Sequence, residues 1–247
     1  MNCREDETLD DLLKDNLRVI QGKKGYRFSI DSVLLAAFAT LGRGSQVCEL
    51  GAGSGVISIL LAQRDRSCSI KALEIQDSLW DRAVRSVKLN RLEDNVEVVK
   101  GDIRQVREIF PAGGFDLVIA NPPFWKIGEG LLPEDPEVAS ACHEIDVTLE
   151  EVIGAASYLL RLGGRLALIQ RASRLDEVIR LSHNYRVPVK RIRMVHPHRQ
   201  RPANLVLTEG TKGAKPGVTV LAPLVVYEET GIYSSEVMTL YYGGEAR

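Results

Sequence analysis

Short, mostly apolar runs alternate with stretches of helical spacing along the first half of the chain. Four such runs are each five residues long and occupy positions 46–50, 69–73, 96–100 and 115–119. Runs this short, closed by glycine, proline or an acidic residue, are typical of buried parallel strands. The intervening stretches 56–63 and 77–91 have the spacing of helices. The alternation predicts an α/β fold with a mainly parallel sheet.

The pattern differs before this region. Residues 9–41 have mostly helical spacing, interrupted by a basic turn at 21–25, and an apolar helix is expected from about Val33 to Thr40. Asp31 or Ser32 is a suitable N-cap for that helix. The sequence therefore predicts a helical N-terminal extension, residues 1–44, before a core of residues 45–247.

The second half of the chain is less regular. Residues 125–141 contain glycine and proline breaks without a clear period, which predicts a loop. Thr148 and Glu151 have capping-box spacing for a helix to about residue 162. A strand, a helix and two strands are then expected at 165–170, 174–183, 189–195 and 204–209. Strand-like runs within 218–242 have no assigned place. Without repeats or a linker, residues 1–247 are predicted to form one domain.

Composition narrows the possible partners. The 247 residues include 32 basic and 33 acidic side chains, so the formal net charge of −1 gives no global attraction to a polyanion. Any nucleic-acid surface must then be local. The four cysteines are far apart, so neither a metal site nor a disulfide framework is expected. The acidic N-terminus lacks an apolar segment behind it, and no run reaches membrane-spanning length, which favours a cytoplasmic location.

The clearest chemical signal follows the run 115–119. Asn121 stands at the carboxyl end of a predicted strand, where open α/β sheets bind ligands. Pro122 and Pro123 stiffen the next turn and leave their carbonyls free, and Phe124 adds an aromatic ring. An amide, rigid carbonyls and a ring suit a flat group that carries an amine. The alternative is a proline-rich loop that ends a strand, with Phe124 in the core.

Three other strand ends carry weaker signals. Gly51, Gly53 and Gly55 form a G-x-G-x-G turn after the acidic Glu49, which suits a cofactor at a helix N-terminus or only a tight connection. Glu74 is placed to accept from both ribose hydroxyls of a nucleoside, or to begin a helix. Next along the chain, Asp102 suits an adenine amine while Ile103 packs on the ring; alternatively, Asp102 caps a short helix.

The order of these features resembles the class I S-adenosylmethionine-dependent methyltransferases, in the branch that methylates planar amino groups. The resemblance implies a Rossmann-like three-layer sandwich whose mainly parallel seven-stranded sheet has its last strand antiparallel. It also implies S-adenosylmethionine as cofactor and a substrate-side role for residues 1–44. The cofactor-binding residues it implies are Glu49, Gly51, Gly53, Gly55, Glu74, Asp102, Ile103, Asn121, Phe28 and Asp31.

The residues themselves suit this chemistry. Hydrogen bonds from an amine to Asn121 Oδ1 and the Pro122 carbonyl would orient its lone pair and stabilise the charge that develops on nitrogen. Phe124 completes the predicted catalytic set by stacking on the base, with Pro123 and Trp125 on the substrate side. No metal is required.

The N-terminal stretch 21–35, together with His143 and Glu144, resembles the bacterial tRNA1(Val) adenine-N6 methyltransferases, which modify the adenosine 3′ of the anticodon. Phe124 departs from the tyrosine common in that branch, so a guanine-N2 methyltransferase of ribosomal RNA stays open. Protein glutamine-N5 methyltransferases share the Asn-Pro-Pro-aromatic motif, and a non-catalytic RNA-binding protein on the same fold is a further alternative.

Local clusters of basic residues are consistent with tRNA as the partner, although a solvated strand edge would have the same composition. Oligomeric state is left open, with a monomer expected. The predicted RNA-binding residues are Lys23, Lys24, Arg27, Lys190, Arg191, Arg193, Arg199 and Arg201.

Overall fold

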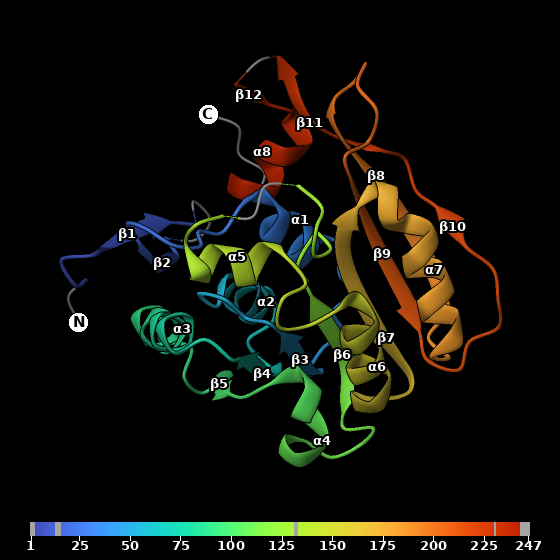
Figure 1. Cartoon of the computed structure of the whole chain (residues 1–247), viewed down its shortest axis with the longest axis horizontal. Coiled ribbons are helices and arrows are strands. Elements are labelled where there is room, and N and C mark those ends of the chain that lie inside the picture. The colour runs from blue at the N-terminus through green and yellow to red at the C-terminus, as the bar shows by residue number, and fades with distance from the viewer. Residues whose placement is uncertain (1–2, 13–15, 131–132, 230, 243–247) are drawn as a thin grey trace.

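A ten-stranded sheet forms the centre of the molecule, with helices on both faces (Figure 1). The computed structural model describes residues 3–12, 16–130, 133–229 and 231–242. The strand order is β12-β11-β8-β9-β7-β6-β3-β4-β5, with β10 beside β8. The strands of this sheet are β3 (Gln46–Leu50), β4 (Ser69–Glu74), β5 (Val96–Lys100), β6 (Phe115–Ala120), β7 (Leu160–Arg171), β8 (Val189–His198), β9 (Leu205–Thr211), β10 (Thr219–Val220), β11 (Leu224–Glu229) and β12 (Ile232–Tyr233).

Seven consecutive strands, β3 to β9, form the predicted core of the sheet. The first five and β8 run in one direction, while β9 pairs antiparallel with both β7 and β8. The prediction of a mainly parallel seven-stranded sheet whose last strand is antiparallel is therefore confirmed. The sheet continues beyond β8, because the unassigned tail adds β10 and β11 parallel to it. That the whole chain forms one domain stays a prediction.

Two apolar clusters, one on each face, hold the helices to the sheet. One contains buried side chains of α1, α2, α3 and α8, and the other contains those of α4, α6 and α7. The capping box predicted at Thr148 and Glu151 is present at the start of α6. The helices are α1 (Ile30–Phe38), α2 (Val56–Arg64), α3 (Asp77–Leu89), α4 (Val106–Ile109), α5 (Pro136–Cys142), α6 (Leu149–Leu159), α7 (Leu175–Asn184) and α8 (Ser235–Tyr242), with 3-10 turns η1 (Ile103–Gln105) and η2 (Ala172–Arg174).

Several predicted boundaries differ from those observed. Helix α6 ends at Leu159 rather than near residue 162, because β7 begins at the next residue. Gly163 and Gly164 lie inside that strand. The segment 125–141, predicted as a loop, contains most of α5; residues 131 and 132 lie outside the described ranges. Asp135 caps α5 and Pro136 occupies its first turn, a helix-start signal that the glycine and proline breaks obscured.

The prediction of a helical N-terminal extension is wrong for its first part. Strands β1 (Glu7–Asp11) and β2 (Arg18–Gly22) form an antiparallel hairpin, and only α1 is helical. Helix α1 is capped by Ser29, not by Asp31 or Ser32. The hairpin lies against α3, where the backbone N–H of Ile20 donates to Ser86 Oγ at 2.9 Å. The local spacing of this segment also suits a helix, so its contacts with α3, far along the chain, determine that it forms strands.

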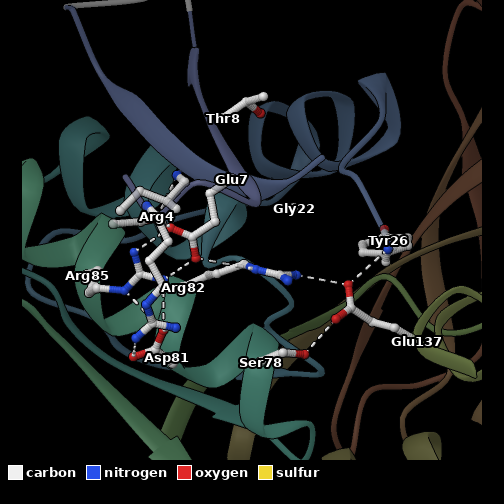
Figure 2. Close-up of polar contacts among 12 residues, drawn as sticks. Arg4, Glu7, Thr8, Gly22, Tyr26, Ser78, Asp81, Arg82, Arg85 and Glu137 are labelled. Atoms are coloured by element: carbon white, nitrogen blue, oxygen red, sulfur yellow. Dashed lines mark hydrogen bonds and ion pairs between the residues drawn. The ribbon is translucent and has the colours of Figure 1, made fainter. Parts of the chain in front are cut away.

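Glu7 anchors this hairpin through a buried ionic network (Figure 2). Its Oε2 accepts from Arg85 Nη1 at 2.8 Å and from the backbone N–H of Arg4 at 2.9 Å. Its Oε1 is paired with Arg85 Nη2 and lies 3.8 Å from Arg82 Nε. The hydrogen bonds from Arg85 lower the pKa of the Glu7 carboxyl to about 2.

Replacing Glu7 by glutamine should destabilise the protein by about 2 kcal/mol at pH 7, because it removes charged hydrogen bonds from the partly buried Arg85 and leaves Asp81 as its remaining carboxylate partner. The Glu7 pKa is lower in the folded chain than in the unfolded chain, where it is about 4.3. The stabilisation is thus present above pH 4.3 and is lost as the pH falls through about 2. Urea unfolding at pH 7 and pH 3 should give a smaller difference from wild type at pH 3. Exposed Glu5→Gln is the control, and an equal difference at both pH values would contradict this role.

Candidate functional site

The glycine turn connects β3 to α2 with its backbone uncovered. Gly51, Gly53 and Gly55 have φ values of +74°, +56° and +84°, a region that side chains with a Cβ rarely adopt. A Cβ at Gly51 would meet nothing within 4 Å, so this part of the turn faces open space. The turn can therefore bring main-chain groups close to a ligand at the start of α2.

Glu49, on β3, supports the turn through hydrogen bonds to α2. It is 1% exposed, and its Oε2 accepts from the backbone N–H of Ser58 at 3.0 Å and also from the Ser58 hydroxyl. Burial raises the pKa of the Glu49 carboxyl to about 8. Glu49 is not among the residues that line the adjoining cavity. The structure thus places it behind the turn, where it ties β3 to α2.

Glu74, at the end of β4, faces the glycine turn. Its Oε2 accepts from the backbone N–H of Gly53 at 2.8 Å, and its Oε1 accepts from the backbone N–H of Gln76 at 2.8 Å. The residue is 5% exposed, and burial raises the pKa of its carboxyl. Glu74, Gly51, Gly53, Ile103 and Asn121 line one cavity of about 90 Å³, which we call the glycine-turn cavity.

The Asp102 side chain, by contrast, bonds to the residue two positions later in the sequence. Its Oδ1 accepts from the backbone N–H of Arg104 at 2.8 Å, and its Oδ2 lies 2.6 Å from Arg104 Nη2. Hydrogen bonds from Arg104 lower the pKa of the Asp102 carboxyl. Asp102 caps η1, as the alternative interpretation expected, while its neighbour Ile103 lines the glycine-turn cavity.

A second cavity of about 280 Å³, which we call the aromatic cavity, adjoins the first. Phe124 and Trp125 line it together with Asp31, whose carboxyl pKa is raised by burial. Four residues line both cavities: Tyr26, Asn121, Pro122 and Ala141. Asn121 therefore lies at the boundary between the glycine turn and the aromatic side chains.

The Asn-Pro-Pro-Phe loop is fixed from two sides. The backbone N–H groups of Phe124 and Trp125 both donate to the Cys142 carbonyl at 3.0 Å, which joins the loop to the end of α5. From β7, Gln170 Nε2 donates to the Pro123 carbonyl at 3.1 Å. Sequence reasoning missed Gln170, because its contact partner lies 47 residues earlier in the chain.

Both aromatic side chains of the loop also have protein partners. Phe124 packs partly against the apolar core. The guanidinium of Arg171 lies 3.6 Å from the centroid of a Trp125 ring, and His143 stacks with Trp125 at 6.5 Å. A base that stacks on Trp125 would have to replace or extend these contacts, and Arg171 had no signal in the sequence.

Of the two N-terminal residues predicted to bind the cofactor, one lines a cavity of the site. Asp31 lines the aromatic cavity, whereas Phe28 packs against the core and is absent from the lining of both cavities. Tyr26, which was not among the predicted site residues, lines both cavities. Its backbone N–H donates to Glu137 Oε1 at 3.0 Å, and Glu137 also accepts from Arg82 on α3 at 2.9 Å (Figure 2). Glu137 thus connects Tyr26, α3 and α5.

The predicted RNA-binding residues of β8 separate into two groups. Near its start, Arg191 Nη1 lies 2.9 Å from the buried carboxylate of Glu209, and Lys190 Nζ donates to the Lys215 carbonyl at 2.9 Å. Arg193 pairs with Glu236 at 2.7 Å. Strand β8 runs parallel to β6, and Asn121 follows the carboxyl end of β6. These three residues therefore lie before the end of β8 that is on the same side of the sheet as Asn121.

Arg199 and Arg201 lie at that edge, just after the end of β8. Both are exposed, and within the described ranges neither side chain forms an ion pair. Together with Glu228 and Glu229, they line an open groove of about 930 Å³. Near the N-terminus, Arg27 pairs with Asp10 at 2.5 Å, Lys23 donates to the Glu5 carbonyl at 2.6 Å, and Lys24 is exposed.

Among the described residues, no group of three or more histidine, cysteine, aspartate or glutamate side chains is placed to hold a metal ion. In the same part of the chain, no helix has the length and apolar character needed to cross a membrane.

The strand order, with one antiparallel strand between β7 and β8, defines a class I S-adenosylmethionine-dependent methyltransferase fold. A crystal structure from Agrobacterium tumefaciens, described as a predicted O-methyltransferase, superposes with a TM-score of 0.68 at 25% identity and covers 88% of this chain and 98% of that one. Residues 29–184 match the methyltransferase small domain family. The chain belongs to this family.

Two curated relatives share most of its length. Both are named tRNA1(Val) (adenine(37)-N6)-methyltransferase. The protein from Photobacterium profundum is 28% identical over 224 residues, which are 90% of this chain and 92% of the relative. The protein from Porphyromonas gingivalis is 30% identical over 226 residues, which are 87% and 86% of the two chains.

The residues around the glycine-turn cavity suit the cofactor of this class. The open space beside Gly51 leaves the backbone accessible, and Glu74 supplies an acidic acceptor at the end of the next strand. Asn121 separates this cavity from the aromatic one, as required if a cofactor and an acceptor group meet at its side chain.

Proposed function

We propose that this protein transfers a methyl group from S-adenosylmethionine to the exocyclic N6 amine of an adenine in tRNA, at the adenosine 3′ of the anticodon. The position of Asn121 between the glycine-turn cavity and the aromatic cavity carries the proposal. The names of the curated relatives support the tRNA substrate. Such a substrate also implies a cytoplasmic location.

Bound S-adenosylmethionine would supply an electrophilic methyl group. The glycine turn and Glu74 would hold the cofactor, with Ile103 against its base. In the aromatic cavity, Asn121 Oδ1 and the Pro122 carbonyl would accept the two N–H groups of the target amine, while Phe124 would contact the base. As the new nitrogen–carbon bond would form, the sulfur–carbon bond to that methyl group would break and positive charge would develop on the nitrogen, where two fixed oxygen acceptors would stabilise it. The nitrogen would then lose one proton to solvent.

The test is transfer of a labelled methyl group from S-adenosylmethionine to unfractionated bacterial tRNA, followed by nucleoside analysis. N6-methyladenosine is the expected product. Labelled N2-methylguanosine would instead assign the enzyme to guanine, the alternative left open by Phe124. If the protein binds S-adenosylmethionine but labels no tRNA, the proposed substrate is wrong, and ribosomal RNA and protein glutamine are the next acceptors to test.

Arg199 and Arg201 provide a test of the tRNA surface. Replacing both by glutamine should raise the KM for tRNA about 10-fold and reduce the slope of log affinity against log salt by about 1 to 2, because each arginine would neutralise a phosphate. Affinity for S-adenosylmethionine should not change. The control is Arg43→Gln with Lys88→Gln, which removes two exposed charges at other surfaces. An unaltered salt slope in the Arg199 and Arg201 variant would exclude these residues from the RNA interface.

A further inference from the structure

The end of β7 extends past the end of β6. The parallel pair places Ala120, the last residue of β6, opposite Leu168, and β7 continues to Arg171. Gln170 therefore lies beside the Asn-Pro-Pro-Phe loop that follows β6. Alternation along a strand puts its side chain on the same face as Leu168.

The two prolines explain why a side chain is needed at this position. A continued β6–β7 ladder would require backbone N–H donors after Asn121, and neither Pro122 nor Pro123 has one. Gln170 Nε2 instead donates to the Pro123 carbonyl at 3.1 Å. The Gln170 Oε1 accepts from the backbone N–H of Arg171 at 2.8 Å, which fixes the orientation of the amide.

Burial of Gln170 favours a single orientation of its side-chain amide. Gln170 is 1% exposed, and both ends of its amide are hydrogen-bonded. A buried side-chain amide without partners is costly, so this rotamer is strongly favoured. The chain just after the prolines is held separately, because the backbone N–H groups of Phe124 and Trp125 donate to the Cys142 carbonyl and the Trp125 carbonyl accepts from the backbone N–H of Glu144.

We propose that Gln170 is a positioning residue for methyl transfer: it holds the Pro123 carbonyl so that Asn121 Oδ1 and the Pro122 carbonyl keep the spacing needed for the two N–H groups of the target amine. The inference rests on the proposed function. Gln170 touches neither the acceptor nor the cofactor in this role, and it acts through the backbone of the loop. Its removal should therefore affect turnover more than binding.

Two variants test this role. Gln170→Met preserves the length of the side chain, and Gln170→Leu introduces an apolar side chain of similar bulk, but neither has a donor for the Pro123 carbonyl. Both should lower kcat for tRNA methylation by about 10²-fold, since displacements of about 1 Å at a reacting centre have effects of that size. The KM for tRNA and the Kd for S-adenosylmethionine should stay within a few-fold of the wild-type values.

A matched control separates positioning from general damage to the sheet. Thr208 is a buried polar residue on neighbouring β9, opposite Leu168, and is absent from the lining of both cavities. Thr208→Val should leave kcat unchanged. All variants are compared at equal occupancy of S-adenosylmethionine, measured by calorimetry, so that any unfolded fraction is excluded from the rate.

The outcomes distinguish the positioning role from the proposed function. A wild-type kcat in Gln170→Met or Gln170→Leu would overturn the positioning role alone. A rise in KM or in the cofactor Kd at constant kcat would overturn it as well. If the wild-type protein itself binds S-adenosylmethionine but methylates no tRNA, the proposed function fails, and this inference fails with it.

Discussion

Replacing Asn121 by alanine is expected to lower methyl transfer at least about 10²- to 10³-fold, the usual effect of removing one fixed hydrogen-bonding group from a polar catalytic site. The side chain lies at the boundary of the glycine-turn and aromatic cavities. Its loss would leave the target amine with the Pro122 carbonyl as its single positioned acceptor. The S-adenosylmethionine Kd should change by no more than a few-fold, because the glycine turn and Glu74 remain.

Comparison of three variants makes this result interpretable. Asn121→Asp retains an acceptor oxygen and should keep more activity than Asn121→Ala. The exposed Asn184, at the end of α7, provides Asn184→Ala as the control for loss of an amide. Single-turnover rates with saturating cofactor report the chemical step directly. Retention of a tenth or more of the wild-type rate in Asn121→Ala would remove this residue from the catalytic role.

Glu74→Ala should weaken S-adenosylmethionine binding about 10- to 100-fold, as expected when a buried charged acceptor is removed from a binding site. The carboxylate accepts from the Gly53 N–H at 2.8 Å, so it both shapes the glycine turn and faces the cavity. Calorimetric titration with S-adenosylmethionine measures the effect without any dependence on RNA.

The control for Glu74 is Glu97→Ala, which removes an exposed carboxylate from the neighbouring strand β5. It should leave the cofactor Kd unchanged. Glu74→Gln keeps one acceptor oxygen, so its Kd should lie between those of wild type and Glu74→Ala. If the Kd of Glu74→Ala equals that of the wild type, Glu74 does not bind the cofactor.

Sequence reasoning succeeded where local pattern determines structure. The strands from β3 to β6 are short apolar runs with clear stops, and three glycines with positive φ mark the turn before α2. It failed at the N-terminus, where the leucines of residues 9–17 have a spacing that also suits a helix. There, the pairing of β1 with β2 and the ion pair between Glu7 and Arg85 favour strands over a helix. The hydrophobic periodicity of a short segment gives no information about either contact.

The site was predicted in outline but not in its contacts. The strand ends that carry Gly53, Glu74 and Asn121 do meet, because parallel strands end at one edge of the sheet. Glu49 lies outside that lining because it bonds to α2. For the basic cluster, the length of β8 was decisive: Arg191 and Arg199 are eight residues apart, about 26 Å along an extended strand. The two arginines therefore lie at opposite ends of the strand although they are close in sequence.

The strand order also bears on how the chain matures during synthesis on the ribosome. Strand β9 lies between β7 and β8, although it is made after both. Until residue 211 has left the exit tunnel, the twelve-residue strand β7 has an unpaired edge and β8 lacks its bridge to the sheet. An exposed edge of that length is a template for wrong pairing between nascent chains. Stalled or truncated chains that end between β8 and β9 are therefore the species most in need of chaperone protection.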